Sequence, residues 1–149
     1  MLLTRTKLPF LAALAMALLS LGGCSAPTNE NAPYTVSNAS IRTPVAGRTT
    51  TAAYFEFTNN SDAAVKIIGV SSTAAERVEM HTIIKVDDQM RMRPLPEIAV
   101  PAKDKVVFAS GGNHLMLFGV QLTDTPAILE IELDNGESIA APFQQTRLN

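Results

Sequence analysis

The side chains of this 149-residue chain that could do metal chemistry are two histidines, six methionines and one cysteine. Met1 and Met16 lie near the start of the chain, whereas both histidines and the other four methionines fall between positions 80 and 116. Imidazole is a borderline metal ligand, and thioether sulfur is soft and uncharged. This combination suits Cu(I) and suits Zn(II), Ca(II) or Mg(II) poorly. The segment therefore predicts a candidate copper site.

The spacing of these residues indicates which of them could share one side of a strand. Residues i and i+2 of a β-strand point to the same side, so His114 shares a face with Met116, and Met90 shares a face with Met92. A hairpin joining the strand of His81 to the strand of Met90 and Met92 would bring that imidazole close to the methionine pair. Two imidazoles and two or three thioethers could then converge at one end of the domain.

Each of these residues also has an ordinary structural interpretation. A methionine on a strand most often fills the core, and Met80 keeps that interpretation because it lies on the apolar side of its strand. A single histidine on a polar strand face is usually solvated. Arg91 and Arg93 fit the solvated face of an edge strand, although they could also steer an acidic partner.

The elements that must position these residues are short β-strands. Polar and apolar residues alternate with a period of two from Tyr34 onward, and no window shows a helical stripe. Pro94, Pro96 and Pro101 predict a loop or an edge, because proline cannot donate to a strand ladder. The pattern predicts an all-β, antiparallel Greek-key β-sandwich of one domain. Strands are expected at residues 54–58, 65–70, 77–86, 90–93, 106–109, 114–120, 128–133 and 138–143.

The first 23 residues have the layout of a secretory signal. Arg5 and Lys7 form a basic region, residues 8–21 are almost entirely apolar, and two glycines follow. The apolar stretch is shorter than the roughly 20 residues that a membrane-spanning helix needs. Cleavage is therefore favoured over a permanent transmembrane helix.

Residues 21–24 (LGGC) resemble a bacterial lipobox, which implies that Cys24 is lipidated and becomes the new N-terminus. The alternative is a plain signal peptide with an incidental cysteine. Residues 24–33 predict a lipidated cysteine and flexible tether, and residues 34–147 the folded domain. The non-acidic Ser25 resembles an outer-membrane sorting signal, so we expect a periplasm-facing, lipid-anchored protein of the bacterial envelope.

Composition excludes several classes of protein. The formal net charge is −2, so no basic excess is available to neutralise phosphates, and we expect no nucleic-acid partner. One cysteine cannot form an internal disulfide, a cysteine-rich zinc site or an iron–sulfur cluster. No nucleophile–base pair suggests catalysis, so we expect a protein that is not an enzyme.

The spacing of four of these residues resembles the signature of the periplasmic copper chaperones of the PCu(A)C type. That signature is a His, ten residues, a Met, twenty-one residues and then His-x-Met, and His81, Met92, His114 and Met116 match it in type and in both gaps. The flanking segments are also similar to the family, and the resemblance covers about residues 34–147. The similar segments are residues 75–81, 90–94, 100–102 and 111–117.

The resemblance implies a cupredoxin-like β-sandwich that binds Cu(I) at its mouth in a shallow site and transfers it by ligand exchange. It implies that His81, Met92, His114 and Met116 are the ligands, with Met90 in reserve because it shares a face with Met92. The implied recipient is the copper centre of cytochrome c oxidase subunit 2, a thioredoxin-like copper protein, or both.

Three features depart from the family. Residues 41–45 lack the tryptophan that members often carry, and Lys103 stands where a glycine is common in a turn. Residues 144–149 contain neither histidine nor methionine, so no second, Cu(II)-binding tail site is expected.

Other functions remain open at this point. A blue-copper electron-transfer protein needs a cysteine thiolate, and Cys24 is expected to be used in the anchor. A copper-scavenging envelope lipoprotein would carry the same ligands as a chaperone that delivers metal. A β-sandwich interaction module that binds no metal would make the motif incidental.

Overall fold

The computed structural model describes residues 32–147, which form ten β-strands. The expected signal peptide, Cys24 and all but the last two residues of the tether lie outside the described residues. Within 32–147, no helix is long and apolar enough to cross a membrane. The strands are β1 (Tyr34–Arg42), β2 (Thr51–Asn59), β3 (Val65–Ser72), β4 (Arg77–Val86), β5 (Gln89–Pro94), β6 (Ile98–Val100), β7 (Asp104–Phe108), β8 (His114–Phe118), β9 (Ala127–Leu133) and β10 (Ser138–Thr146).

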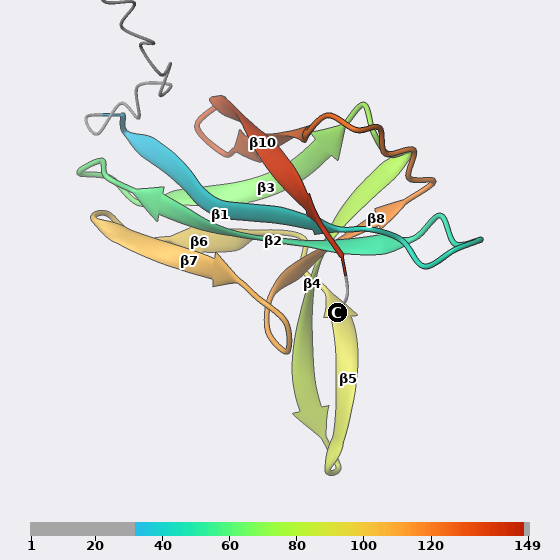
Figure 1. Cartoon of the computed structure of the whole chain (residues 1–149). Helices are drawn as coiled ribbons and strands as arrows, with labels where there is room; N and C mark the ends of the chain where they lie inside the picture. Colours follow the sequence, from blue (N-terminus) through green and yellow to red (C-terminus); the bar gives the residue numbers. More distant parts are fainter. Residues whose placement is uncertain (1–31, 148–149) are drawn as a thin grey trace, which may run out of the picture.

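The strands form a sandwich whose two sheets are joined through β10 (Figure 1). The hydrogen-bonded order is β5-β4-β8-β2-β1-β10-β9-β3-β6, and β7 pairs with β2 beside β8. Residues 138–143 of β10 pair with β9, whereas residues 144–146 pair with β1. The predicted antiparallel arrangement is confirmed with one exception, because the β1–β10 pairing is parallel.

The core between the sheets is built from the inward residues of alternating strands. Every second residue of β2 and of β9 is buried, as the period-two pattern predicts. Phe55 stacks on Phe108 with ring centroids 4.3 Å apart, and Phe143 meets Phe55 edge-on. Met80 is also buried, which confirms its interpretation as a core residue.

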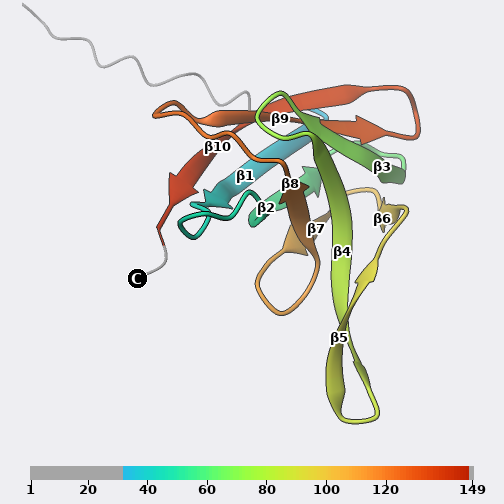
Figure 2. The ribbon, with the colours of Figure 1, turned by 90° about the vertical axis from the view of Figure 1, so that its right-hand side faces the viewer.

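The β4–β5 hairpin projects from the sandwich (Figure 2). Its turn is Asp87-Asp88, between the paired residues Val86 and Gln89, and both aspartates have positive φ angles of 50° and 61°. Positive φ at both central residues is the conformation that suits the twist of a two-residue hairpin. All six residues of β5 are exposed, so the methionines of this strand lie on an open edge.

Two of the observed strands, β1 and β6, were not among the strands expected from the sequence. A bulge between Ser37 and Ser40, with Asn38 at φ 53°, interrupts the alternation that begins at Tyr34, so β1 was not expected as a continuous strand. The proline-rich segment contains β6, a three-residue strand at the edge beside β3. The expectation of a loop or an edge is therefore confirmed as an edge.

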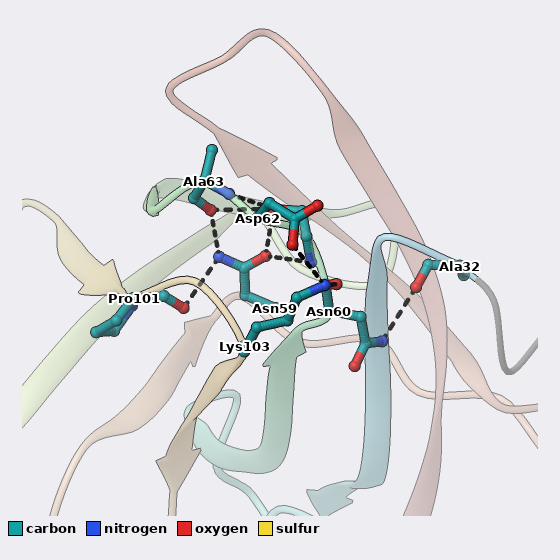
Figure 3. Close-up of polar contacts among 8 residues, drawn as sticks. Ala32, Asn59, Asn60, Asp62, Ala63, Pro101 and Lys103 are labelled. Carbon is teal, nitrogen blue, oxygen red and sulfur yellow. Dashed lines mark hydrogen bonds and ion pairs between the residues drawn. The ribbon is translucent and has the colours of Figure 1, made fainter.

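Asn59, at the end of β2, ties the two sheets together (Figure 3). Its side-chain amide is fully buried and donates to the carbonyl oxygens of Ala63, Val100 and Pro101, at distances of 2.8, 3.2 and 3.1 Å. Its carbonyl oxygen accepts from the backbone N–H of Ser61 at 3.0 Å. This contact closes one end of the sandwich.

Candidate metal centre

The two histidines face each other across neighbouring strands. The β4–β8 pairing aligns His81 with His114, and their ring centroids are 5.9 Å apart at an interplanar angle of 49°. Bonds from imidazole nitrogen to first-row metals are about 2 Å long. One ion therefore fits between the two rings.

The pair lies on the sheet face that points away from the core. Met80 and Leu115 are paired one position along the same strands, and both are buried in the core. Because successive side chains alternate between faces, His81 and His114 lie on the other side. His81 and His114 form the last pair of the β4–β8 ladder, at the end of the sandwich from which the β4–β5 hairpin projects, as the sequence led us to expect.

The hydrogen bond of His114 determines which of its nitrogens is free. Its Nδ1 lies 3.0 Å from the carbonyl oxygen of Gly112. A carbonyl can only accept, so Nδ1–H is the donor and the neutral ring has its lone pair on Nε2. Gly111 supplies the turn before this contact with a φ of 85°. The backbone thus orients His114 with Nε2 available for a metal.

In His81 the free nitrogen is Nδ1, whereas in His114 it is Nε2. Its Nε2 lies 2.9 Å from Oε2 of Glu79, and an ionised carboxylate can only accept. The lone pair of the neutral ring is therefore on Nδ1, which is buried and has no hydrogen-bond partner among the described residues. A buried, unpartnered nitrogen is costly unless something binds it. The donor set thus fits a metal between the two rings.

Sequence reasoning missed Glu79 as a functional residue. It lies two positions before His81 on the same face of β4, so the i,i+2 rule could have identified it. Its other oxygen, Oε1, accepts from Nε of Arg77 at 2.8 Å. The hydrogen bond from His81 and the nearby charge of Arg77 lower the pKa of Glu79, so the carboxylate is ionised at neutral pH.

The methionines surround the imidazole pair at different depths. Met116 is paired with Glu79 on the same face, which places it diagonally across from His81. It also lines a surface pocket with Ala52 and the segment that follows β1. Met92 is paired with Ile83 and is diagonal to His81 on the other side. Met116 and Met92 are thus both within one diagonal step of His81, a distance that long side chains span.

Met90 lies further from the imidazoles. It is paired with Lys85, two residues beyond Ile83 on the hairpin, so the structure does not place it beside the histidine pair. Met90 is 63% exposed, against 46% for Met92.

The depth of the site differs from the expected shallow site. His114 is only 4% exposed and the side chain of His81 13%, whereas Met92 is open to solvent. The imidazoles are held by hydrogen bonds within the sheet, and the hairpin methionines lie on an edge strand. Only the methionine side of the site is therefore shallow. Among residues 32–147, no group of three or more His, Cys, Asp or Glu side chains could hold a metal.

The family model described as "Putative lipoprotein LpqE-like" matches residues 34–136 of the chain. A relative from Leifsonia xyli subsp. xyli (strain CTCB07), named "Putative lipoprotein Lxx21020", is 28% identical over 125 residues, which cover 78% of this chain and 74% of that protein.

Solved structures share the fold. The copper-bound PCuAC domain from PmoF2 has a TM-score of 0.65 at 18% identity, with 78% of this chain and 95% of that domain covered. Apo-DR1885 from Deinococcus radiodurans has a TM-score of 0.58 at 21% identity, with 92% of this chain and 97% of that protein covered. The fold is thus the cupredoxin-like β-sandwich of PCuAC domains. Because the family model spans most of the described residues, the chain belongs to the LpqE-like lipoprotein family.

Proposed function

We propose that this protein is an extracytoplasmic copper chaperone that binds Cu(I) through His81, Met92, His114 and Met116. The observation that carries the proposal is the imidazole pair, with ring centroids 5.9 Å apart and a buried Nδ1 of His81 that has no hydrogen-bond partner within residues 32–147. The PCuAC domain from PmoF2 and DR1885, which share the fold, have both been solved with copper bound.

The arrangement suits transfer of the metal as cargo. The four proposed ligands are neutral, so they hold Cu(I) without the thiolates that oxidation outside the cytosol would convert to a disulfide. The half-exposed Met92 gives an acceptor access by ligand exchange. We propose delivery to the copper centre of cytochrome c oxidase subunit 2, to a thioredoxin-like copper protein, or to both.

A Cu(I) competition titration tests the ligand set. The protein lacking residues 1–24 is titrated against a Cu(I) chelator, beside the four single ligand-to-alanine variants. Each variant should lose affinity, whereas the control Met80→Leu should bind as the wild type does, because Met80 is a core residue. Failure of the wild type to compete with the chelator would favour an interaction module that binds no metal.

Delivery is separated from scavenging in a deletion strain. We expect loss of oxidase activity that excess copper restores. Unchanged oxidase activity with heightened copper sensitivity would instead identify a copper-scavenging envelope lipoprotein.

A further inference from the structure

We propose that Glu79 is a positioning residue that makes His81 bind Cu(I) through Nδ1, while His114 binds through Nε2. The inference rests on the proposed function. It concerns the groups that hydrogen-bond to the ligand histidines and do not themselves bind the metal. Histidine ligands commonly donate their other N–H to a carboxylate or a carbonyl, which fixes the tautomer and the ring orientation. Here His81 uses a carboxylate and His114 uses the carbonyl oxygen of Gly112.

The carboxylate of Glu79 is itself held in place from the other side. Arg77 donates to its Oε1 at 2.8 Å, and the Arg77 guanidinium lies 4.4 Å over the ring of Phe118. Arg77 is also aligned with Phe118 across the β4–β8 pairing. The side chains at 77, 79 and 81 therefore form one connected row on the same face of β4.

This row differs from an ordinary surface ion pair. Exposed ion pairs contribute little to stability, because water weakens the attraction between the charges and two long side chains must be held in one conformation. Glu79 instead uses one oxygen for the Arg77 guanidinium and the other for the His81 imidazole. The imidazole keeps a buried nitrogen that no residue in the described part of the chain contacts by a hydrogen bond. Both histidines thereby present unprotonated nitrogens, although by opposite tautomers.

The test is Glu79→Gln, with Glu130→Gln on the outward side of β9 as the matched control. In the apo protein, ¹⁵N NMR of the imidazoles should show the Nε2–H tautomer for His81 and the Nδ1–H tautomer for His114. Glu79→Gln should mix the His81 tautomers and lower Cu(I) affinity by about 10-fold or more. The control should change neither readout.

The two measurements separate the possible failures. An Nδ1–H tautomer of His81 in the wild type would overturn the inference, as would a Glu79→Gln variant with unchanged tautomer and affinity. Lower affinity with an unchanged tautomer would also overturn it, because Glu79 would then act by another route. A wild type that shows both expected tautomers but does not bind Cu(I) would contradict the proposed function. It would also contradict the part of this inference that concerns metal binding.

A second inference rests on the exposed hairpin: we infer that Met90 is a transfer ligand that Cu(I) meets on its way out. Exposure rises outward on one face, since His81 is partly buried, whereas Met92 is 46% and Met90 63% exposed. Met90 and Met92 are two residues apart on β5, so both lie on the face of His81. The inference also rests on the proposed function.

The proposed step is ligand exchange without redox change. While Met92 keeps its bond to the metal, one copper–nitrogen bond breaks as a copper–sulfur bond to Met90 forms, and the metal remains Cu(I). Met90 is paired with Lys85, four residues beyond His81 on β4, whereas Met92 is paired with Ile83. A thioether at this more distant and exposed position suits transit rather than storage.

Met90→Leu tests this step, with Ile84→Leu on the opposite face of the hairpin as its control. Transfer to excess bathocuproine disulfonate, followed by stopped-flow absorbance, should slow several-fold in Met90→Leu while the equilibrium Cu(I) affinity stays within about two-fold of wild type. The control should transfer at the wild-type rate. An unchanged rate in Met90→Leu overturns the inference. An affinity loss as large as that of Met92→Leu also overturns it, because Met90 would then be a resting ligand.

Discussion

At the scale of single residues, the two histidines differ in how they are held. His114 is fixed by the backbone of the preceding turn, whereas His81 is fixed by the side chain of Glu79. A side-chain contact can be removed by substitution and a backbone carbonyl cannot. If the proposed site binds Cu(I), a substitution at position 79 should change its affinity more than a substitution at position 112.

Cu(I) affinity should fall as the pH drops from 7 to 5. Protons compete with the metal for the free imidazole nitrogens, so metal binding weakens in the acidic range. Hydrogen bonding from His81 and the charge of Arg77 hold the pKa of Glu79 below its ordinary value, so this carboxylate stays ionised across the range. Competition titrations at several pH values measure the effect. A flat profile would indicate a site made of methionines alone.

At the scale of elements, turns with positive φ position the strands that carry the site. Asp87-Asp88 closes the hairpin of Met92, and Gly111 precedes His114. Lys103, between β6 and β7, has a φ of 58°, a left-handed conformation that glycine adopts without steric cost. Its Nζ compensates in part by contacting the carbonyl oxygen of Asn60 at 2.7 Å and Asp62 at 2.9 Å.

Lys103→Gly should be more stable than Lys103→Ala by about 1 kcal/mol. Both substitutions remove the same contacts of Nζ, but only glycine relieves the left-handed conformation. Urea unfolding of the two variants measures the difference in the free energy of unfolding. Equal stabilities would show that the turn relaxes to another conformation.

At the scale of the whole molecule, the contact that joins the two sheets and the proposed metal site lie at opposite ends of β2. Asn59 joins the sheets at one end of this strand, whereas Ala52, near its other end, is paired with Met116. The β10 strand provides a second connection between the sheets. Substitutions at the Asn59 end should therefore affect the fold without affecting the site.

Asn59→Ala should lower the free energy of unfolding by about 2–3 kcal/mol, because it leaves buried carbonyl oxygens without donors. Cu(I) affinity of the folded variant should equal that of the wild type. Urea unfolding and chelator competition measure the two quantities on the same sample. Lost affinity in a variant that remains folded would contradict the separation.

Cys24→Ser should abolish membrane association and leave Cu(I) binding intact. The prediction depends on the lipobox-like sequence before Cys24 and on the lipoprotein named by the family description, since this residue lies outside the described part of the chain. Fractionation of cells that express either form measures the association and also distinguishes outer from inner membrane. A serine variant that still partitions with membranes would rule out the lipid anchor.

The sequence by itself determined the all-β class, the two faces of each strand and the pair of gaps that selected four candidate ligands. These are local properties, since alternation and residue type can be read within a few positions. Only the tertiary structure decided that β8 lies beside β4 and that His81 is aligned with His114. It also decided the contact of Glu79 with His81, and hence which nitrogen is free. Strand partners and register depend on the packing of the whole core, and tautomers depend on neighbours that folding brings together.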